Sequence, residues 1–335
     1  MKNDNKKYKA VGLLSGGLDS ALAAKLLLDQ GIEVHAVSIA MPWGCGAPSR
    51  VVKLAEKLGM PLKIIPLADD YLSILTKPKY GFGSAHNPCI DCHIYMVKKA
   101  AAYMKEIGAS FVFTGEVLGQ RPMSQRRKCL DWVEQDGGIP GRLLRPLSAK
   151  LLPATIPEQE GIVDREKLLD ISGRARRPQY DLALKLGVDG FSSPGGGCLL
   201  TEKLFGERLK DALKHGCRDI ASSAVLGIGR YFRVDDDTFV ILGRDQNENE
   251  KLIKFAMPED VLVRPMVFPG PVALLRAKAV TEAHVTLAAG LSQFYSKSKG
   301  KDPLPLSYWR CDDPDRVQDV VAAVVNEKNI KKMML

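Results

Sequence analysis

Residues 10–20 read AVGLLSGGLDS, and this stretch decides the fold of the first half of the chain. A short apolar run at 10–14 leads into a turn rich in glycine. Apolar residues then recur with helical spacing from Ala21 to Leu28. A strand, a tight turn and a helix in that order are typical of the first βα unit of a parallel sheet.

The same alternation continues along the chain. We expect further strands at 34–39, 62–67 and 111–114, and helices at 51–58 and 94–107. Gly31, Gly59 and Gly108 stand where glycines that end helices belong. The pattern predicts an α/β fold with a doubly wound, mostly parallel sheet, whose ligands bind at the carboxyl ends of the strands.

The character of the sequence changes near residue 218. Two strands at 231–234 and 239–242 flank three aspartates, which indicates a hairpin. We expect later strands at 261–263 and 272–275, a helix at 281–295, and a closing helix or strand at 317–325. The sequence therefore predicts two domains, an α/β domain at 1–217 and a smaller α+β domain at 218–335.

Composition narrows the class of protein. The chain has 335 residues, of which 45% are hydrophobic, and no run of about 18 apolar residues occurs that could span a membrane. The amino terminus has no apolar stretch typical of a secretory signal. Seven cysteines without such a signal favour a reducing compartment, so we expect a cytoplasmic protein whose cysteines are thiols, metal ligands or catalysts.

The net charge of +9 is unevenly distributed. Residues 1–217 hold 31 basic and 23 acidic side chains, whereas residues 218–335 hold 17 and 16. A basic excess is compatible with a polyanionic partner. The first domain, rather than the second, is therefore expected to attract it.

The glycine-rich turn has the chemistry of a phosphate-binding loop. Glycines let backbone N–H groups approach phosphate oxygens, and the start of the following helix favours negative charge. No Lys-Ser/Thr pair follows, so the turn is not a Walker A loop. The alternative is a plain turn that caps a helix. The residues predicted to bind the phosphates of ATP are Ser15, Gly16, Gly17, Leu18, Asp19 and Ser20, with Asp19 also a candidate Mg²⁺ ligand and catalytic residue.

The hexapeptide at 15–20 resembles the PP-loop of the N-type ATP pyrophosphatases, whose fold is like that of the adenine nucleotide alpha hydrolases. The resemblance implies that ATP adenylates an oxygen of the substrate and releases pyrophosphate, after which a nucleophile displaces AMP. Residues 114–120, TGEVLGQ, look like the segment after the corresponding strand in tRNA 4-thiouridine synthetases. On this resemblance, Gly115 and Gln120 lie beside the nucleotide.

The positions of three cysteines help to decide which group of thiolation enzymes the chain resembles. Cys89 and Cys92 form a C-x-x-C motif at the start of a helix, and Cys198 ends a triple-glycine loop. A helix N-terminus favours thiolates, and three thiols without an evident fourth ligand suit a [4Fe–4S] cluster with one open iron. Similarity to PP-loop tRNA thiolases with this arrangement implies that the three are ligands and catalytic residues, the open iron carrying the sulfur.

Other uses of these cysteines remain open. A structural Zn²⁺ ion normally takes four ligands, and His93 or His86 could complete a set. The C-x-x-C thiols could instead pass persulfide sulfur directly, or all three cysteines could be structural. Cys45 is either an additional sulfur carrier or a small buried thiol.

Two basic groups are candidates for contact with RNA phosphates, because guanidinium forks suit phosphate oxygens. The alternative is a solvated surface with local ion pairs. The groups are Arg121, Arg126, Arg127 and Lys128, and Arg174, Arg176 and Arg177. In the second domain, residues 240–250 weakly resemble a pattern of the NFACT-R RNA-binding module, and 284–291 extend the likeness; a dimerisation or lid domain is the alternative.

These resemblances imply an ATP-dependent tRNA sulfurtransferase that makes a thionucleoside, with thiouridine favoured. ATP, Mg²⁺ and the cluster are the expected cofactors, and tRNA and a sulfur donor (inorganic sulfide or a persulfide-carrying protein) the partners. The alternatives are an amidating PP-loop ligase and a non-catalytic RNA-binding or sulfur-carrier protein. The PP-loop begins within the first 15 residues, so we expect RNA to dock without the ferredoxin-like and THUMP domains of classical synthetases. The sequence leaves the oligomeric state, the thiolated position and the sulfur donor open.

Overall fold

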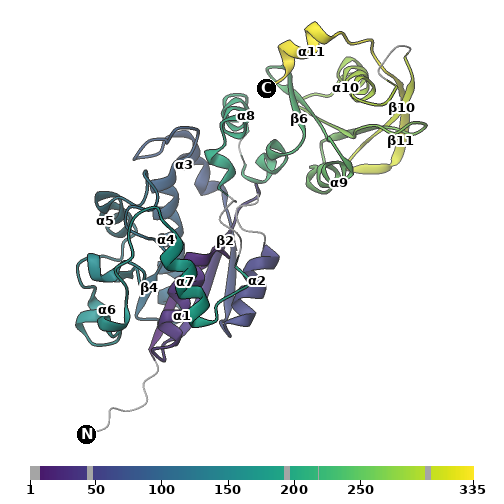
Figure 1. Ribbon diagram of the computed structural model, residues 1–335. Helices are drawn as coiled ribbons and strands as arrows, with labels where there is room; N and C mark the ends of the chain where they lie inside the picture. Colours follow the sequence, from purple (N-terminus) through teal and green to yellow (C-terminus); the bar gives the residue numbers. More distant parts are fainter. Residues whose placement is uncertain (1–7, 44–47, 192–196, 218, 299–302) are drawn as a thin grey trace. The chain divides into compact units, whose positions relative to one another are not determined.

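The computed structural model describes residues 8–43, 48–191, 197–217, 219–298 and 303–335. The chain folds as two compact units, Met1–Thr201 and Glu202–Leu335 (Figure 1). The second unit includes the helix Lys203–Lys214. The boundary that the sequence predicts, at residue 217, would assign this helix to the first domain.

Five parallel strands form the sheet of the first unit, in the order β3-β2-β1-β4-β5. From β1 the chain adds β2 and then β3 on one side of the sheet. It then crosses back over β1 and adds β4 and β5 on the opposite side. This reversal makes the sheet doubly wound, as the sequence predicts, and it places the switch point between β1 and β4. The strands are β1 Lys9–Leu13, β2 Glu33–Ala40, β3 Leu62–Pro66, β4 Phe111–Phe113 and β5 Leu143–Leu144.

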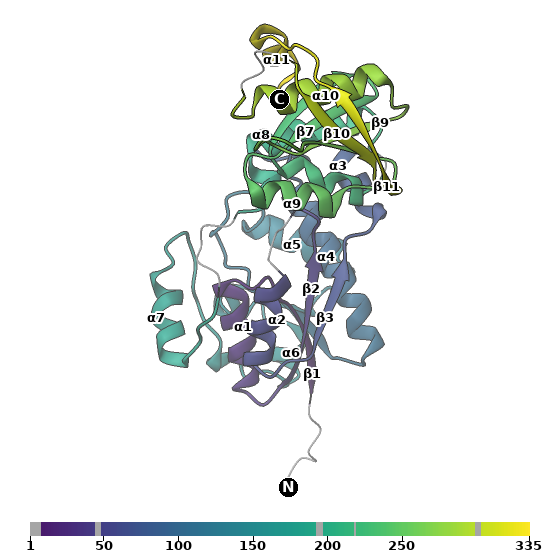
Figure 2. The ribbon, with the colours of Figure 1, turned by 90° about the vertical axis from the view of Figure 1, so that its right-hand side faces the viewer.

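Helices cover both faces of this sheet (Figure 2). Helices α1, α2 and α7 bury their apolar side chains in one cluster with the strands, while α4 packs against β1, β4 and α5. Right-handed crossovers require this division, because the two directions of winding place their helices on opposite faces. The helices of the first unit are α1 Leu18–Leu28, α2 Pro48–Lys57, α3 Leu72–Thr76, α4 Cys89–Glu106, α5 Arg127–Asp136, α6 Ile156–Gln159 and α7 Arg177–Leu186.

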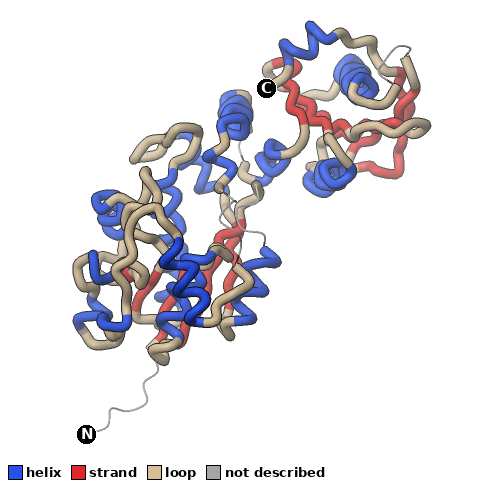
Figure 3. The backbone as a smooth tube through the Cα atoms, viewed as in Figure 1, coloured by secondary structure: helices blue, strands red, loops and turns tan. Residues whose placement is uncertain are grey.

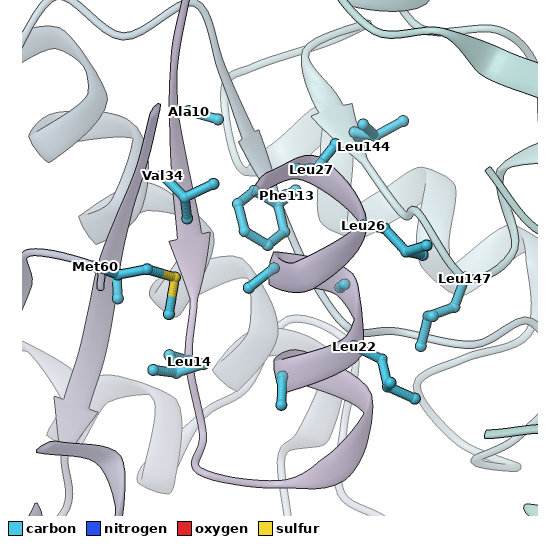
Figure 4. Packing of buried hydrophobic residues seen from close by; sticks show 14 of the residues in the cluster. Ala10, Leu14, Leu22, Leu26, Leu27, Val34, Met60, Phe113, Leu144 and Leu147 are labelled. Carbon is cyan, nitrogen blue, oxygen red and sulfur yellow. The ribbon is translucent and has the colours of Figure 1, made fainter. Parts of the chain in front are cut away.

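The core of the first unit lies between α1 and the middle strands (Figure 4). Leu22 and Leu27 of α1 are fully buried and belong to one cluster with Phe113 of β4 and Leu144 of β5. Gly12 of β1 makes this packing possible, because a Cβ atom there would lie 2.3 Å from the Phe113 ring. The core therefore fixes the carboxyl ends of β1 and β4 relative to each other.

The second unit is a six-stranded antiparallel sheet in the order β11-β10-β8-β9-β7-β6 (Figure 3). Helix α10 buries Val285, Ala288 and Leu291 against it, and β6 and β7 form the predicted hairpin. The strands are β6 Arg230–Asp235, β7 Thr238–Leu242, β8 Val261–Pro265, β9 Ala273–Ala277, β10 Pro305–Arg310 and β11 Asp313–Val321. The helices are α8 Lys203–Lys214, α9 Gln246–Phe255, α10 Glu282–Phe294 and α11 Glu327–Met333.

Strand β11 is the outer edge of the second sheet, and among the described strands it pairs with β10 alone. Its residues 313–319 are all exposed. The tail that the sequence predicts as a closing helix or strand is therefore a strand over most of its length. Among the described residues, no helix combines the length and apolar character that crossing a membrane requires.

Candidate active site

The glycine-rich turn joins β1 to α1 at the switch point of the sheet. The Ser20 hydroxyl donates a hydrogen bond to the Gly17 carbonyl oxygen at 3.0 Å and lies 3.2 Å from the Ser15 hydroxyl. Gly16 has a φ of +76°, a conformation that favours glycine. Gly17, at the start of α1, has no side chain to cap the helix, so the first-turn N–H groups remain available to an anion.

Asp19 is the acidic side chain of this turn. The Gln120 side-chain amide donates a hydrogen bond to Asp19 Oδ2 at 2.7 Å, and the Gln179 amide in turn lies 2.8 Å from Gln120. The other carboxylate oxygen, Oδ1, is buried without a hydrogen-bond partner among the described residues. A carboxylate oxygen in this state fits a Mg²⁺ ligand, because Mg²⁺ prefers hard oxygen donors.

Gly115 holds the segment after β4 against the turn. A Cβ atom at Gly115 would lie 2.5 Å from the backbone nitrogen of Ser20 and 2.6 Å from the carbonyl carbon of Asp19. Both of these are backbone atoms, so a larger residue would have to push the whole turn away. Close packing therefore explains why this chain has glycine at position 115, in the segment that resembles the thiouridine synthetases.

Replacing Gly115 with alanine should weaken ATP binding at least tenfold and lower the melting temperature. The displaced turn could no longer direct its N–H groups at phosphate. Binding titrations with ATP and thermal denaturation measure the two effects. Gly31→Ala is the control, because it strains a positive φ in open space and should cost about 1 kcal/mol of stability without changing ATP affinity. Equal ATP affinity in both variants would contradict the steric role of Gly115.

The three predicted sulfur ligands come from two parts of the first unit. Cys89 is the first residue of α4, Cys92 lies one turn later and is buried, and Cys198 precedes a short turn closed by Thr201. Burial, reinforced by the charges of all three cysteines, raises the pKa of Tyr71 well above its usual range. The fold therefore brings the three thiols within electrostatic reach of one buried phenol.

Within the described ranges, no three His, Cys, Asp or Glu side chains converge closely enough to hold a metal ion. Cys45 lies outside the described residues. The two histidines of the zinc alternative each engage one ring nitrogen elsewhere: His86 Nε2 lies 2.8 Å from the Leu75 carbonyl oxygen, and His93 Nδ1 lies 2.7 Å from Glu116 Oε1.

A buried ion network connects the cysteine helix to the nucleotide segment. Glu116, next to Gly115, contacts His93 of α4 and accepts a hydrogen bond from Arg145 Nε at 3.1 Å. Arg145 also binds Glu134 of α5 at 3.2 Å. Burial alone would raise the pKa of Glu116, but the charge of Arg145 and the hydrogen bond from His93 lower it to about 2. Sequence analysis did not predict this network, because its members are far apart in the chain.

The network makes stability depend on pH in a defined direction. Because the folded pKa of Glu116 lies below its ordinary 4.5, its contribution is complete above that pH and is lost as pH falls through about 2. The contribution is roughly 3 kcal/mol. Glu116→Gln should lower the unfolding free energy by about that amount at pH 7, with the difference shrinking towards pH 2, as urea denaturation would measure. Glu106→Gln, at an exposed ion pair with Lys63, should change it by less than about 1 kcal/mol.

The two basic groups are joined through the backbone. The Gly173 N–H donates a hydrogen bond to the Leu118 carbonyl oxygen at 2.8 Å, and Leu118 pairs with Ser172. This pairing places both groups next to Gln120, which binds Asp19. Arg127 and Arg177 form ion pairs within their helices, with Asp131 and Asp181. Of the seven side chains, Arg176 is half-buried and the other six are exposed, namely Arg121, Arg126, Arg127, Lys128, Arg174 and Arg177.

Comparison with known proteins matches two separate parts of the chain to two families. Residues 6–149 match the family described as thiamine biosynthesis protein (ThiI), and residues 229–334 match the NFACT protein RNA binding domain. A probable tRNA sulfurtransferase of Thermococcus kodakarensis is 31% identical over 49% of this chain and 40% of its own length. A tRNA-specific 2-thiouridylase MnmA of Dehalococcoides mccartyi is 32% identical over 34% of this chain and 35% of its own.

The chain therefore spans well under half the length of these curated relatives. Among solved structures, a 4-thiouridine synthetase–RNA complex with bound ATP aligns over 54% of this chain and 52% of its own, at 23% identity and a TM-score of 0.35. The U34-tRNA thiolase NcsA from Methanococcus maripaludis with its [4Fe-4S] cluster aligns over 59% and 63%, at 16% identity and a TM-score of 0.29. Residues 6–149 are therefore similar to the ThiI family, and residues 229–334 to the NFACT RNA-binding family.

Proposed function

We propose that this chain is an ATP-dependent tRNA sulfurtransferase that converts a uridine to a thiouridine. One observation carries the proposal: Gly115 packs on the PP-loop while its neighbour Glu116 holds His93, the residue that follows Cys92. The same short segment thus connects the nucleotide turn with the thiols. On this proposal, the phosphate chemistry and the sulfur chemistry would take place at neighbouring positions.

Two substitutions make up the proposed reaction. In the first, a nucleobase carbonyl oxygen attacks the α-phosphorus of ATP; an O–P bond forms, the α–β anhydride bond breaks, and pyrophosphate leaves. The N–H groups of the PP-loop and the hydroxyls of Ser15 and Ser20 bind the leaving pyrophosphate. In the second, a sulfur nucleophile attacks the activated carbon; a C–S bond forms, the C–O bond breaks, and AMP leaves.

Asp19 has the chemistry to hold a metal ion in the first step. Its Oδ1 is buried without a partner among the described residues, and Gln120 fixes the orientation of the carboxylate. Mg²⁺, when bound, neutralises charge on the phosphates. The role of this chain is to keep the carboxylate aligned.

Cys89, Cys92 and Cys198 would hold a [4Fe–4S] cluster. Three thiols fit such a group in donor type and number, and they would have to move together from their described positions to hold it. When bound, such a cluster would supply the sulfur nucleophile of the second substitution. Zn²⁺ and direct transfer of persulfide sulfur are the competing uses of the same thiols.

We further propose tRNA as the substrate, a reaction in the cytoplasm, and inorganic sulfide or a persulfide-carrying protein as the sulfur donor. The names of the curated relatives and the NFACT match at 229–334 support an RNA substrate. So do the arginines next to Gln120, because a tRNA backbone needs cationic partners at the reaction site.

Two measurements test the proposal together. Iron, sulfide and zinc are quantified after anaerobic purification, and tRNA nucleosides from cells with and without the gene are compared by mass spectrometry. We expect about four irons per chain and loss of one thionucleoside. An unchanged set of thionucleosides would overturn the tRNA assignment, and pyrophosphate release without iron or thiolation would favour the amidating alternative. No pyrophosphate release at all would favour a binding protein.

A further inference from the structure

An exposed aromatic pair lies beside the C-x-x-C motif. The rings of Phe82 and His86 stack with centroids 4.2 Å apart and planes inclined by 22°. Phe82 remains 38% exposed, at the level of the exposed aromatic side chains Tyr8, Tyr180 and Phe255, but it alone of these lies in the segment that leads to the C-x-x-C motif. The segment that carries the pair connects α3 to α4 and ends at Cys89.

Hydrogen bonds hold this segment in one shape and connect it to the sulfur. Asn87 is the centre: its carbonyl oxygen accepts from the Gly83 N–H at 2.9 Å, its Oδ1 accepts from the Ala85 N–H at 3.0 Å, and its Nδ2 donates to Cys89 Sγ at 3.1 Å. His86 Nε2 lies 2.8 Å from the Leu75 carbonyl oxygen at the other end. The aromatic pair is therefore positioned relative to the Cys89 thiol.

The charge around the pair is mixed: Lys79 pairs with Asp136, and the Asp91 carboxylate accepts hydrogen bonds from the N–H groups of Lys79 and Tyr80. Residues 77–88 contain two lysines and no acidic side chain. Asn87 Nδ2 also contacts Met123 Sδ at 3.6 Å, so the segment touches the stretch of chain that lies between Arg121 and Arg126 in the sequence. Both arginines are exposed, and neither forms an ion pair with any described residue. An anion with a flat apolar part fits this combination of ring and charge.

We propose that the exposed face of Phe82 stacks on one unpaired nucleobase of the RNA substrate, while Arg121 and Arg126 bind the adjacent phosphates. This inference rests on the proposed function and identifies a surface that would position the RNA substrate. A base must leave its helical stack before its carbonyl group can react, and an aromatic platform offsets the lost stacking. Because stacking accepts any base, Phe82 would hold the strand in place beside Cys89 without reading its sequence.

Phenylalanine variants separate stacking from simple apolar contact. Phe82→Leu keeps apolar volume but removes the flat ring, and Phe82→Trp keeps a flat ring. Phe82→Leu should weaken tRNA binding roughly tenfold with an unchanged salt dependence, and Phe82→Trp should bind as the wild type does. Arg121→Ala with Arg126→Ala should weaken binding and also reduce the slope against salt concentration by about two. Ile64→Ala, which removes an exposed apolar side chain from the edge strand β3, is the matched control.

The measurement uses the full chain, tRNA binding at several salt concentrations, ATP binding as proof of folding, and thionucleoside yield. If the wild type produces no thionucleoside, the proposed function fails. If it does, and Phe82→Leu binds and thiolates tRNA normally, this inference alone fails. If tRNA binding is normal but sulfur transfer from a donor protein is lost in Phe82→Leu, the pair is a protein-docking surface and the inference is overturned.

Discussion

Replacing Asp19 with asparagine should lower the rate of pyrophosphate release from ATP in the presence of tRNA by about 10²–10³-fold. The two side chains have almost the same shape, and asparagine can still contact Gln120, so the effect isolates the negative charge of the carboxylate. Loss of that charge removes a hard oxygen ligand for Mg²⁺ from beside the phosphates. Steady-state release of pyrophosphate, with Mg²⁺ varied, measures the change.

The matched control is Asp29→Asn at the other end of α1. Asp29 forms an exposed ion pair with Lys25, so its substitution should leave the rate unchanged and alter stability by less than about 1 kcal/mol. A wild-type rate in Asp19→Asn would show that the carboxylate has no part in adenylation. Pyrophosphate release would then have to depend on the loop backbone alone.

Replacing Cys198 with alanine should abolish thiolation and remove the bound iron while ATP affinity stays within about twofold. A cluster that depends on three thiols is lost when one is removed, whereas the phosphate-binding turn is held by its own hydrogen bonds, such as that from the Ser20 hydroxyl to the Gly17 carbonyl oxygen. Iron content, absorbance after anaerobic purification, ATP titration and thionucleoside yield are measured on the same preparation. Cys311→Ala, in the second unit, is the control and should retain iron and activity.

The same variant distinguishes the competing uses of the cysteines. Normal thiolation by Cys198→Ala would exclude the cluster mechanism. Activity in a wild-type preparation that contains neither iron nor zinc would favour direct transfer of persulfide sulfur. Stoichiometric zinc in the wild type, with His93→Ala losing it, would favour the structural zinc site.

The sequence was informative where local chemistry determines structure. The apolar runs predicted β1 to β4, because buried parallel strands need continuous apolar residues, and the glycine-rich turn marked the start of α1. Strand β5 was missed because only Leu143 and Leu144 form it. Helix α9 was missed because its residues are polar and only Leu252 is buried, so no apolar periodicity marks it.

Contacts between distant segments could not be predicted in the same way. The sequence pointed to Gln120 through its resemblance, yet the bond from Gln120 to Asp19 depends on β1 and β4 being neighbours in the sheet. Nothing in the sequence predicted that Arg145 is buried, because a single arginine after an irregular segment is normally expected to be exposed to solvent. Its burial next to Glu116 follows from the packing of α5 against α4.

The outer strand of the second unit has a consequence for behaviour at high concentration. An exposed edge offers free N–H and C=O groups to any similar strand, and such edges can recruit further copies into fibres. Strand β11 carries Asp313, Asp315, Arg316 and Asp319 along that edge, all exposed. A second copy would have to desolvate these charges to extend the sheet. The charges along this edge therefore oppose its pairing with a second copy.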